Sequence, residues 1–319
     1  MKKLTLLLLA LLYVTLTYAY TERDLLQKQA DINRLKEILV LDRQWVTYPD
    51  YNDRAGWDRF LGTFKDEYIR RGEKRLNYQW QVVKATDYLA FERTGNRQIM
   101  EKPFGANNGA IADLLMAELA EGKGRFVDQL INGVFNACEM TSWALAAHII
   151  VQPSHRALPA YDYPVIDLTS GDLGGLLAWT YHFMRPSFDK VDPEISRRLR
   201  HELQTRILDP YMNNDSFWWM GRNYNGRMLN NWNPWCNSNA LMCFMLLEDN
   251  RDTLAKAVHL TMESVDKFLN YIKADGACEE GPSYWGHAAG KTLDYLELLS
   301  DITGDKVNKI GRASCRERV

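Results

Sequence analysis

Residues 254–268 read LAKAVHLTMESVDKF, and the spacing of the apolar side chains in this stretch decides the fold class. Leu254, Val258 and Val265 recur at intervals of four and seven residues, which places them on one face of an α-helix. Similar helical spacing is found in residues 25–40, 111–119 and 127–138. The sequence therefore predicts an all-α chain.

The segments between these helices contain clusters of turn-forming residues, at positions 102–105, 158–160 and 213–215. Alternating strand patterns are scarce, apart from short stretches such as residues 78–83. The helices follow one another in hairpin-like pairs without a fixed sequence period, which disfavours a short-repeat solenoid. We therefore expect an incomplete (α/α) toroid of helical hairpins, in which loops at one end of the ring build a cleft.

The first 19 residues have the three parts of a secretory signal peptide. Two lysines precede an apolar run at residues 4–16, and small residues surround an expected cleavage after Ala19. This run is shorter than the roughly 20 apolar residues that span a bilayer. We expect a periplasmic or secreted bacterial protein with no membrane span after cleavage, whose toroid domain comprises residues 20–309.

Composition narrows the class of partner. With 25% charged and 46% hydrophobic residues and a net charge of −2, the chain has a globular profile that gives no indication of nucleic-acid binding. Ten Trp and sixteen Tyr favour a carbohydrate partner, because the C–H faces of sugars stack on aromatic rings. No metal site or cofactor is identified, and the cysteines lack the spacing of a zinc site. We expect buried free thiols at Cys138, Cys236, Cys243 and Cys278.

The last ten residues, 310–319, read IGRASCRERV. They are the translation of ATC GGA AGA GCG TCG TGT AGG GAA AGA GTG, which is a common sequencing-adapter read. We interpret this segment as an artefact and expect the natural protein to continue beyond Asn308.

An asparagine-rich segment at residues 218–239 has a composition that packing alone does not explain, because its amides alternate with tryptophans. Amide side chains are neutral donors and acceptors suited to a polar ligand. We expect this segment to be a loop before an apolar helix at residues 240–247. Asn230, Asn231 and Asn233 are the candidates for ligand contact, and Asn237 or Asn239 is expected to cap that helix.

A second loop is predicted at residues 275–287, between two helices. Its glycines free the backbone and its proline stiffens it, so that Glu280, Tyr284 and His287 would be presented on a short rigid turn. The alternatives are that the tyrosine ring merely anchors the turn and that the histidine is a structural hydrogen-bonding group.

Together, Asn230-Asn231-Trp232-Asn233 and Glu280-Gly281-Pro282-Ser283-Tyr284-Trp285 resemble the two cleft motifs of the heparinase II/III family of polysaccharide lyases. The resemblance covers residues 42–299 and implies an (α/α) toroid followed by a β-sandwich domain that supplies a catalytic histidine. It also implies that Tyr284 is the catalytic base or acid and that Asn230 or Asn231 neutralises a uronate carboxylate. This chain ends before such a sandwich. The residues expected to bind substrate are Asn233, Arg222, Trp232, Trp235, Glu280, Trp285 and His287.

The reaction implied is β-elimination at a uronic acid in a glycosaminoglycan or alginate-like polysaccharide. The C5 proton is weakly acidic, and an amide or Arg222 bound to the neighbouring carboxylate would stabilise the enolate-like transition state. An ordinary tyrosine has a pKa near 10, so a tyrosine base needs nearby positive charge or must share the proton transfer.

Two other functions remain open. A glycoside hydrolase would need a pair of carboxylates at the scissile bond, for which Asp275, Glu279 and Glu280 are candidates. A non-catalytic glycan-binding protein would use Trp218, Trp219, Trp232 and Trp235 as stacking platforms. The His-Glu pair at His201 does not continue as a zinc-protease motif.

Overall fold

The computed structural model describes residues 22–223, 228–272 and 280–307. All of the regular structure in these ranges is helical, with no strand, which confirms the all-α prediction. The α-helices are α2 (Ile32–Ile38), α3 (Arg54–Leu61), α4 (Lys65–Glu73), α5 (Ala85–Thr94), α6 (Gln98–Glu121), α7 (Val127–Glu139), α8 (Ala146–Ile149), α9 (Leu168–Val191), α10 (Pro193–Leu203), α11 (Asp209–Asn213), α12 (Trp232–Leu247), α13 (Arg251–Tyr271) and α14 (Pro282–Ile302). Two 3-10 turns, η1 (Gly62–Phe64) and η3 (Trp218–Met220), and one π-helical turn, η2 (Gln204–Leu208), complete the set.

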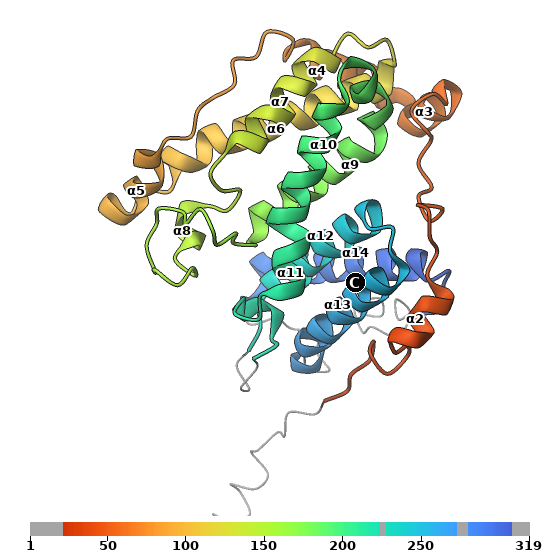
Figure 1. The fold of residues 1–319 in the computed structure, drawn as a ribbon, viewed down its shortest axis with the longest axis vertical. Helices are drawn as coiled ribbons and strands as arrows, with labels where there is room; N and C mark the ends of the chain where they lie inside the picture. The colour runs from red at the N-terminus through yellow and green to blue at the C-terminus, as the bar shows by residue number, and fades with distance from the viewer. Residues whose placement is uncertain (1–21, 224–227, 273–279, 308–319) are drawn as a thin grey trace, which may run out of the picture.

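The helices form two groups, with α3 to α7 in one and α11 to α14 with α2 in the other (Figure 1). The long helices α9 and α12 pack against each other and join the groups, while α13 and α14 both pack on α12. The first helix, α2, packs on α13. The backbone N–H of Val40, just after α2, donates to the carbonyl of Ile302 at 2.8 Å. Early and late segments of the described chain are therefore neighbours.

The apolar face predicted for residues 254–268 is the buried face of α13. Leu254, Val258, Val265 and Phe268 are all at most 2% exposed. Burying a side chain of this size stabilises the fold by about 1.5–3 kcal/mol relative to leaving it in water. The helix begins where Asn250 accepts a hydrogen bond from the N–H of Thr253, a usual N-cap arrangement.

Three local predictions were wrong. Residues 102–105 form no turn but lie inside α6, where Pro103 falls in the second turn and Phe104 packs in the core. Residues 25–40 form a helix only over Ile32–Ile38, because Asp31 caps a new helix by accepting from Arg34 N. Residues 78–83 form no strand. The side-chain amide of Asn107 bonds both the N–H and the carbonyl of Gln81, at 3.0 and 2.8 Å, and takes the place of a sheet partner.

An N-terminal clasp, residues 23–27, holds the start of the described chain on α13. The carboxylate of Asp266 accepts from Leu26 N at 3.0 Å and from Gln27 N at 2.9 Å. The amide oxygen of Asn270 accepts from Arg23 N at 2.7 Å. Burial raises the pKa of Asp266, and these backbone donors partly offset that rise.

Three of the predicted free thiols, Cys138, Cys236 and Cys243, are buried and unpaired, as expected. Burial raises the thiol pKa of Cys138 and of Cys243 to about 12, so both stay protonated near neutral pH. Cys278, the expected signal peptide and residues 310–319 lie outside the described residues. Within the described part, no helix has the length and apolar character needed to cross a membrane.

Candidate functional site

The two sequence motifs meet at one place, where α9, α12 and α14 begin. The carboxylate of Glu280, just before α14, accepts a hydrogen bond at 3.2 Å from the backbone N–H of Asn231, just before α12. Asp172, in the second turn of α9, accepts from the indole of Trp235 at 2.7 Å. We call these three helix starts the helix-tip site. Helix N-termini carry unpaired N–H groups and partial positive charge, which together favour anions.

The first motif is not a loop. Helix α12 begins at Trp232, eight residues before the predicted start, so Trp232, Asn233 and Trp235 lie in its first turns. The predicted capping by Asn237 or Asn239 is also wrong, because both lie within the helix. Asn231 occupies the N-cap position without a side-chain cap bond. The chain is helical here because Asn233 and Asn237 have buried hydrogen-bond partners, a tertiary effect that local propensity does not report.

Asn233 and Asn237 form a buried amide ladder with Ser264 of α13. Asn233 is 0% exposed, and its amide nitrogen donates to the Trp219 carbonyl at 2.7 Å and to the Ser264 carbonyl at 3.0 Å. The amide of Asn237 donates to the Asn233 carbonyl at 2.7 Å and to the Ser264 hydroxyl at 2.9 Å. Asn233, predicted to bind substrate, is thus directed into the core in this structure.

Asn230 and Asn231 immediately precede α12 at the helix-tip site. Asn230 is half-buried, and its side-chain oxygen accepts from Trp232 N at 3.0 Å. Asn231 is 3% exposed, and its side-chain oxygen has no hydrogen-bond partner among the described residues. A buried amide oxygen without a partner is costly and calls for a functional explanation. The side-chain oxygen of Asn233 is likewise buried without a partner among the described residues.

The second motif also differs from its prediction, because Tyr284, Trp285 and His287 lie in the first turns of α14. Pro282 occupies the first helical turn, where its missing N–H costs nothing. Tyr284 is 45% exposed and Trp285 is 42% exposed. These aromatic rings therefore project from the helix start into solvent and are accessible to a ligand.

Trp235 of α12 contacts both α9 and α14. Its ring stacks on His287 with centroids 5.3 Å apart, and the ammonium of Lys291 lies 5.3 Å from the ring centroid. Asp172 accepts from the Trp235 indole and, at 2.7 Å, from the Asn239 amide. Desolvation raises the pKa of Asp172, and these two hydrogen bonds oppose the rise. Trp235 is held at fixed orientation by these contacts.

Trp232 lies next to a histidine–carboxylate pair that the sequence analysis missed. Its ring contacts His148 edge-on, with centroids 4.6 Å apart, and its other neighbour is the 43% exposed ring of Trp218 at 5.4 Å. His148 Nδ1 lies 2.6 Å from the carboxylate of Asp167, which is 0% exposed. A buried carboxylate of this kind fixes the tautomer and orientation of a histidine.

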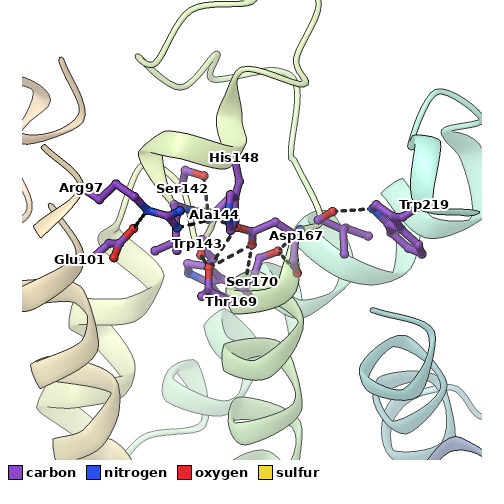
Figure 2. Close-up of polar contacts among 12 residues, drawn as sticks. Arg97, Glu101, Ser142, Trp143, Ala144, His148, Asp167, Thr169, Ser170 and Trp219 are labelled. Atoms are coloured by element: carbon purple, nitrogen blue, oxygen red, sulfur yellow. Dashed lines mark hydrogen bonds and ion pairs between the residues drawn. The ribbon is translucent and has the colours of Figure 1, made fainter. Parts of the chain in front are cut away.

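Figure 2 shows Asp167 at the centre of this network, with Arg97 reaching the far side of His148. Asp167 caps α9 by accepting from Ser170 N at 2.7 Å and also accepts from Leu145 N at 3.1 Å. Arg97 lies 3.3 Å from His148 Nε2 and pairs with Glu101. The sequence signal for this cap was the Asp-Leu-Thr-Ser pattern at residues 167–170, an N-cap signature before an apolar run.

Arg222, predicted to bind the uronate, is used within the protein. Its guanidinium pairs with Asp215 at 3.0 Å, donates to the Tyr211 carbonyl at 2.8 Å, and lies over the Tyr211 ring. Of the carboxylates proposed for a hydrolase, Glu280 bonds Asn231, while Asp275 and Glu279 lie outside the described residues.

The described residues contain no group of three or more His, Cys, Asp or Glu side chains arranged to hold a metal ion. Comparison with protein-family models and with curated proteins found no match to this chain.

Proposed function

We propose that the chain is part of an exported polysaccharide lyase of the heparinase II/III type, which cleaves a uronic-acid-containing polysaccharide by β-elimination. The proposal includes an (α/α) toroid for these helices. The packing of α2 against α13 supports it, because a ring brings early and late helices together. The observation that carries the functional proposal is the contact between the two motifs. Asn231 and Glu280, 49 positions apart, are joined by a hydrogen bond at the helix-tip site.

The chemistry of this site suits an acidic sugar. A uronate carboxylate at the starts of α12 and α14 would meet the positive ends of two helix dipoles. The amide of Asn231 or Asn230 would bind it more tightly as charge develops on the enolate, which lowers the barrier. Lys291, half-buried beside Trp235, adds a positive charge near the same rings.

Tyr284 has the position of a proton-transfer group in this proposal. It is exposed, lies in the first turn of α14, and its ring centroid is 5.7 Å from that of His287. Tyr284 would take the C5 proton and return a proton to the leaving oxygen, while Trp285 and Trp235 would stack on neighbouring sugar rings.

The experiment compares Tyr284→Phe with the parent in the full-length lyase that this proposal implies, on heparan sulfate, chondroitin sulfate and alginate. A lyase creates a C4–C5 double bond that absorbs in the near ultraviolet. We expect the variant to lose about 10²-fold to 10⁴-fold in rate, the usual contribution of a general acid or base, while its thermal unfolding stays unchanged. The matched control is Tyr48→Phe, which alters another half-exposed tyrosine that contacts Phe60 and Trp179 instead.

Other outcomes separate the alternatives. New reducing ends without ultraviolet absorbance would contradict the lyase proposal and favour a hydrolase. Glycan binding without any cleavage would favour the binding protein. The exposed rings of Trp218 and Trp285 support the latter as the second candidate, since a stacking platform needs accessible aromatic faces.

A further inference from the structure

A cavity of about 260 Å³ lies between the segments that flank α8 and the end of α10. Part of the lining comes from the segments on either side of α8, residues 141–143, 160, 161 and 163–165. Residues 201, 202, 205 and 206 line another part. Ser170 of α9 contributes to the lining, so the cavity shares one helix turn with the helix-tip site. Its size is somewhat below the roughly 300–1,000 Å³ of most ligand pockets, so it suits at most one small ring.

An unusual piece of backbone shapes this cavity. Residues Gln204–Leu208 form a π-helical turn, in which the N–H of Asp209 donates to the carbonyl of Gln204. Such turns are rare and are frequently found at functional sites, because the extra residue per turn redirects side chains. Here the turn contributes Thr205 and Arg206 to the lining.

The charges that line the cavity cancel. Glu202 accepts from Arg198 at 2.9 Å and from Arg206 at 2.5 Å, and Arg198 also pairs with Glu139 at 3.3 Å. Of these groups only Glu202 and Arg206 line the cavity, and they neutralise each other. A sulfate or a uronate would find no uncompensated arginine here, and an anion would have to compete with Glu202.

Apart from these charged groups, the cavity is lined by aromatic rings and neutral hydrogen-bonding atoms. Tyr163 is fixed at the wall, where its hydroxyl accepts from the Asn214 amide at 3.0 Å. Tyr161 is 92% exposed, and neither its hydroxyl nor the imidazole of His201 has a hydrogen-bond partner within the described part of the chain. Sugar hydroxyls need such unengaged donors and acceptors, and a sugar ring stacks on an aromatic face.

We propose that this cavity binds one uncharged hexopyranose unit of a glycan, with Tyr161 closing over the ring and His201 bonding its hydroxyls. The proposal does not depend on catalysis at the helix-tip site. A lyase, a hydrolase and a binding protein could each hold a neutral sugar here beside an acidic one.

The test is saturation-transfer NMR on the full chain with the methyl glycosides of glucose, galactose and mannose, and with methyl galacturonate as the acidic counterpart. We expect at least one neutral glycoside to bind. Tyr161→Ala and His201→Gln should each weaken that binding about fivefold, the loss expected for one stacking or hydrogen-bonding contact. Tyr161→Ala removes a side chain that is almost fully exposed, so its thermal unfolding should match that of the parent.

Two controls locate the binding. Tyr48→Ala removes a different half-exposed tyrosine and should leave the affinity unchanged. Phe64→Ala removes an exposed ring of η1, which lines neither the cavity nor the helix-tip site, and should also leave it unchanged. The proposal is overturned if none of the three neutral glycosides binds, if binding survives intact in both cavity variants, or if methyl galacturonate binds more tightly than the neutral sugars.

Discussion

The starts of α12 and α14 differ in how their polar side chains are used, although the sequence gives both the same appearance of a ligand-binding loop. At α12 the amides of Asn233 and Asn237 are buried and bonded to Trp219 and Ser264. At α14 the rings of Tyr284 and Trp285 are exposed. The polar side chains at the start of α12 therefore stabilise the fold, whereas the rings at the start of α14 are accessible to a partner. A site of this kind needs both, because accessible groups work only on a rigid support.

The largest effect on stability is expected for Asn233→Ala. The change leaves the buried carbonyls of Trp219 and Ser264 without this donor, and each unsatisfied buried group costs about 1–3 kcal/mol. We expect the free energy of unfolding to fall by about 3 kcal/mol in urea titrations. Asn223→Ala, at an exposed asparagine that bonds the Asp215 carbonyl, should change it by less than about 0.5 kcal/mol. Equal effects of the two changes would show that the buried hydrogen bonds of Asn233 do not stabilise the fold.

A smaller loss is expected for Tyr211→Phe. The Tyr211 hydroxyl, fully buried behind α12, bonds the amide oxygen of Asn237, and the variant leaves that oxygen unpaired. We expect a decrease of about 1–2 kcal/mol in the free energy of unfolding. A double-mutant cycle with Asn237→Ala should show coupling between the two changes, because both remove the same bond. If the stability losses of the two single variants simply added in the double variant, the hydrogen bond between Tyr211 and Asn237 would not contribute to stability.

The start of α14 should tolerate the loss of an aromatic side chain. Tyr284→Ala removes a ring that is 45% exposed, so the free energy of unfolding should change by less than about 0.5 kcal/mol. Thermal unfolding monitored by circular dichroism would measure this. A loss above about 1.5 kcal/mol would show that Tyr284 anchors the turn, which is the structural alternative considered for this residue.

The most subtle effect concerns Asp172, which touches both regions through Trp235. Desolvation raises the pKa of this carboxyl, while the hydrogen bond from the Trp235 indole lowers it by stabilising the charged form. Trp235→Phe removes the donor and keeps a ring, so the pKa of Asp172 should rise further. Carboxyl ¹³C NMR titration of both proteins measures the change. A fall in the pKa would mean that the hydrogen bond does not act on the carboxylate.

The sequence was sufficient to predict a helix where the spacing of apolar residues was the dominant signal. The apolar spacing of α7 and α13 predicted helices close to those observed, because burial of one face decides helix formation. It was insufficient for α12, where the residues that look like a loop are helical because their partners, Ser264 and Tyr211, come from distant segments. The proximity of the two motifs was implied only by resemblance, and His148 was missed because its partner Asp167 lies 19 positions away.

The N-terminal clasp has a consequence for the order of folding. Leu26 and Asp266, which it joins, are 240 positions apart in the chain. Closing so large a loop is entropically unfavourable until the intervening helices have formed, whereas helix bonds close over four residues. The clasp should therefore form late during refolding. The amide hydrogens of Leu26 and Gln27 should also exchange with solvent sooner than those in the middle of α13, since a terminal segment can open without unfolding the helices beneath it.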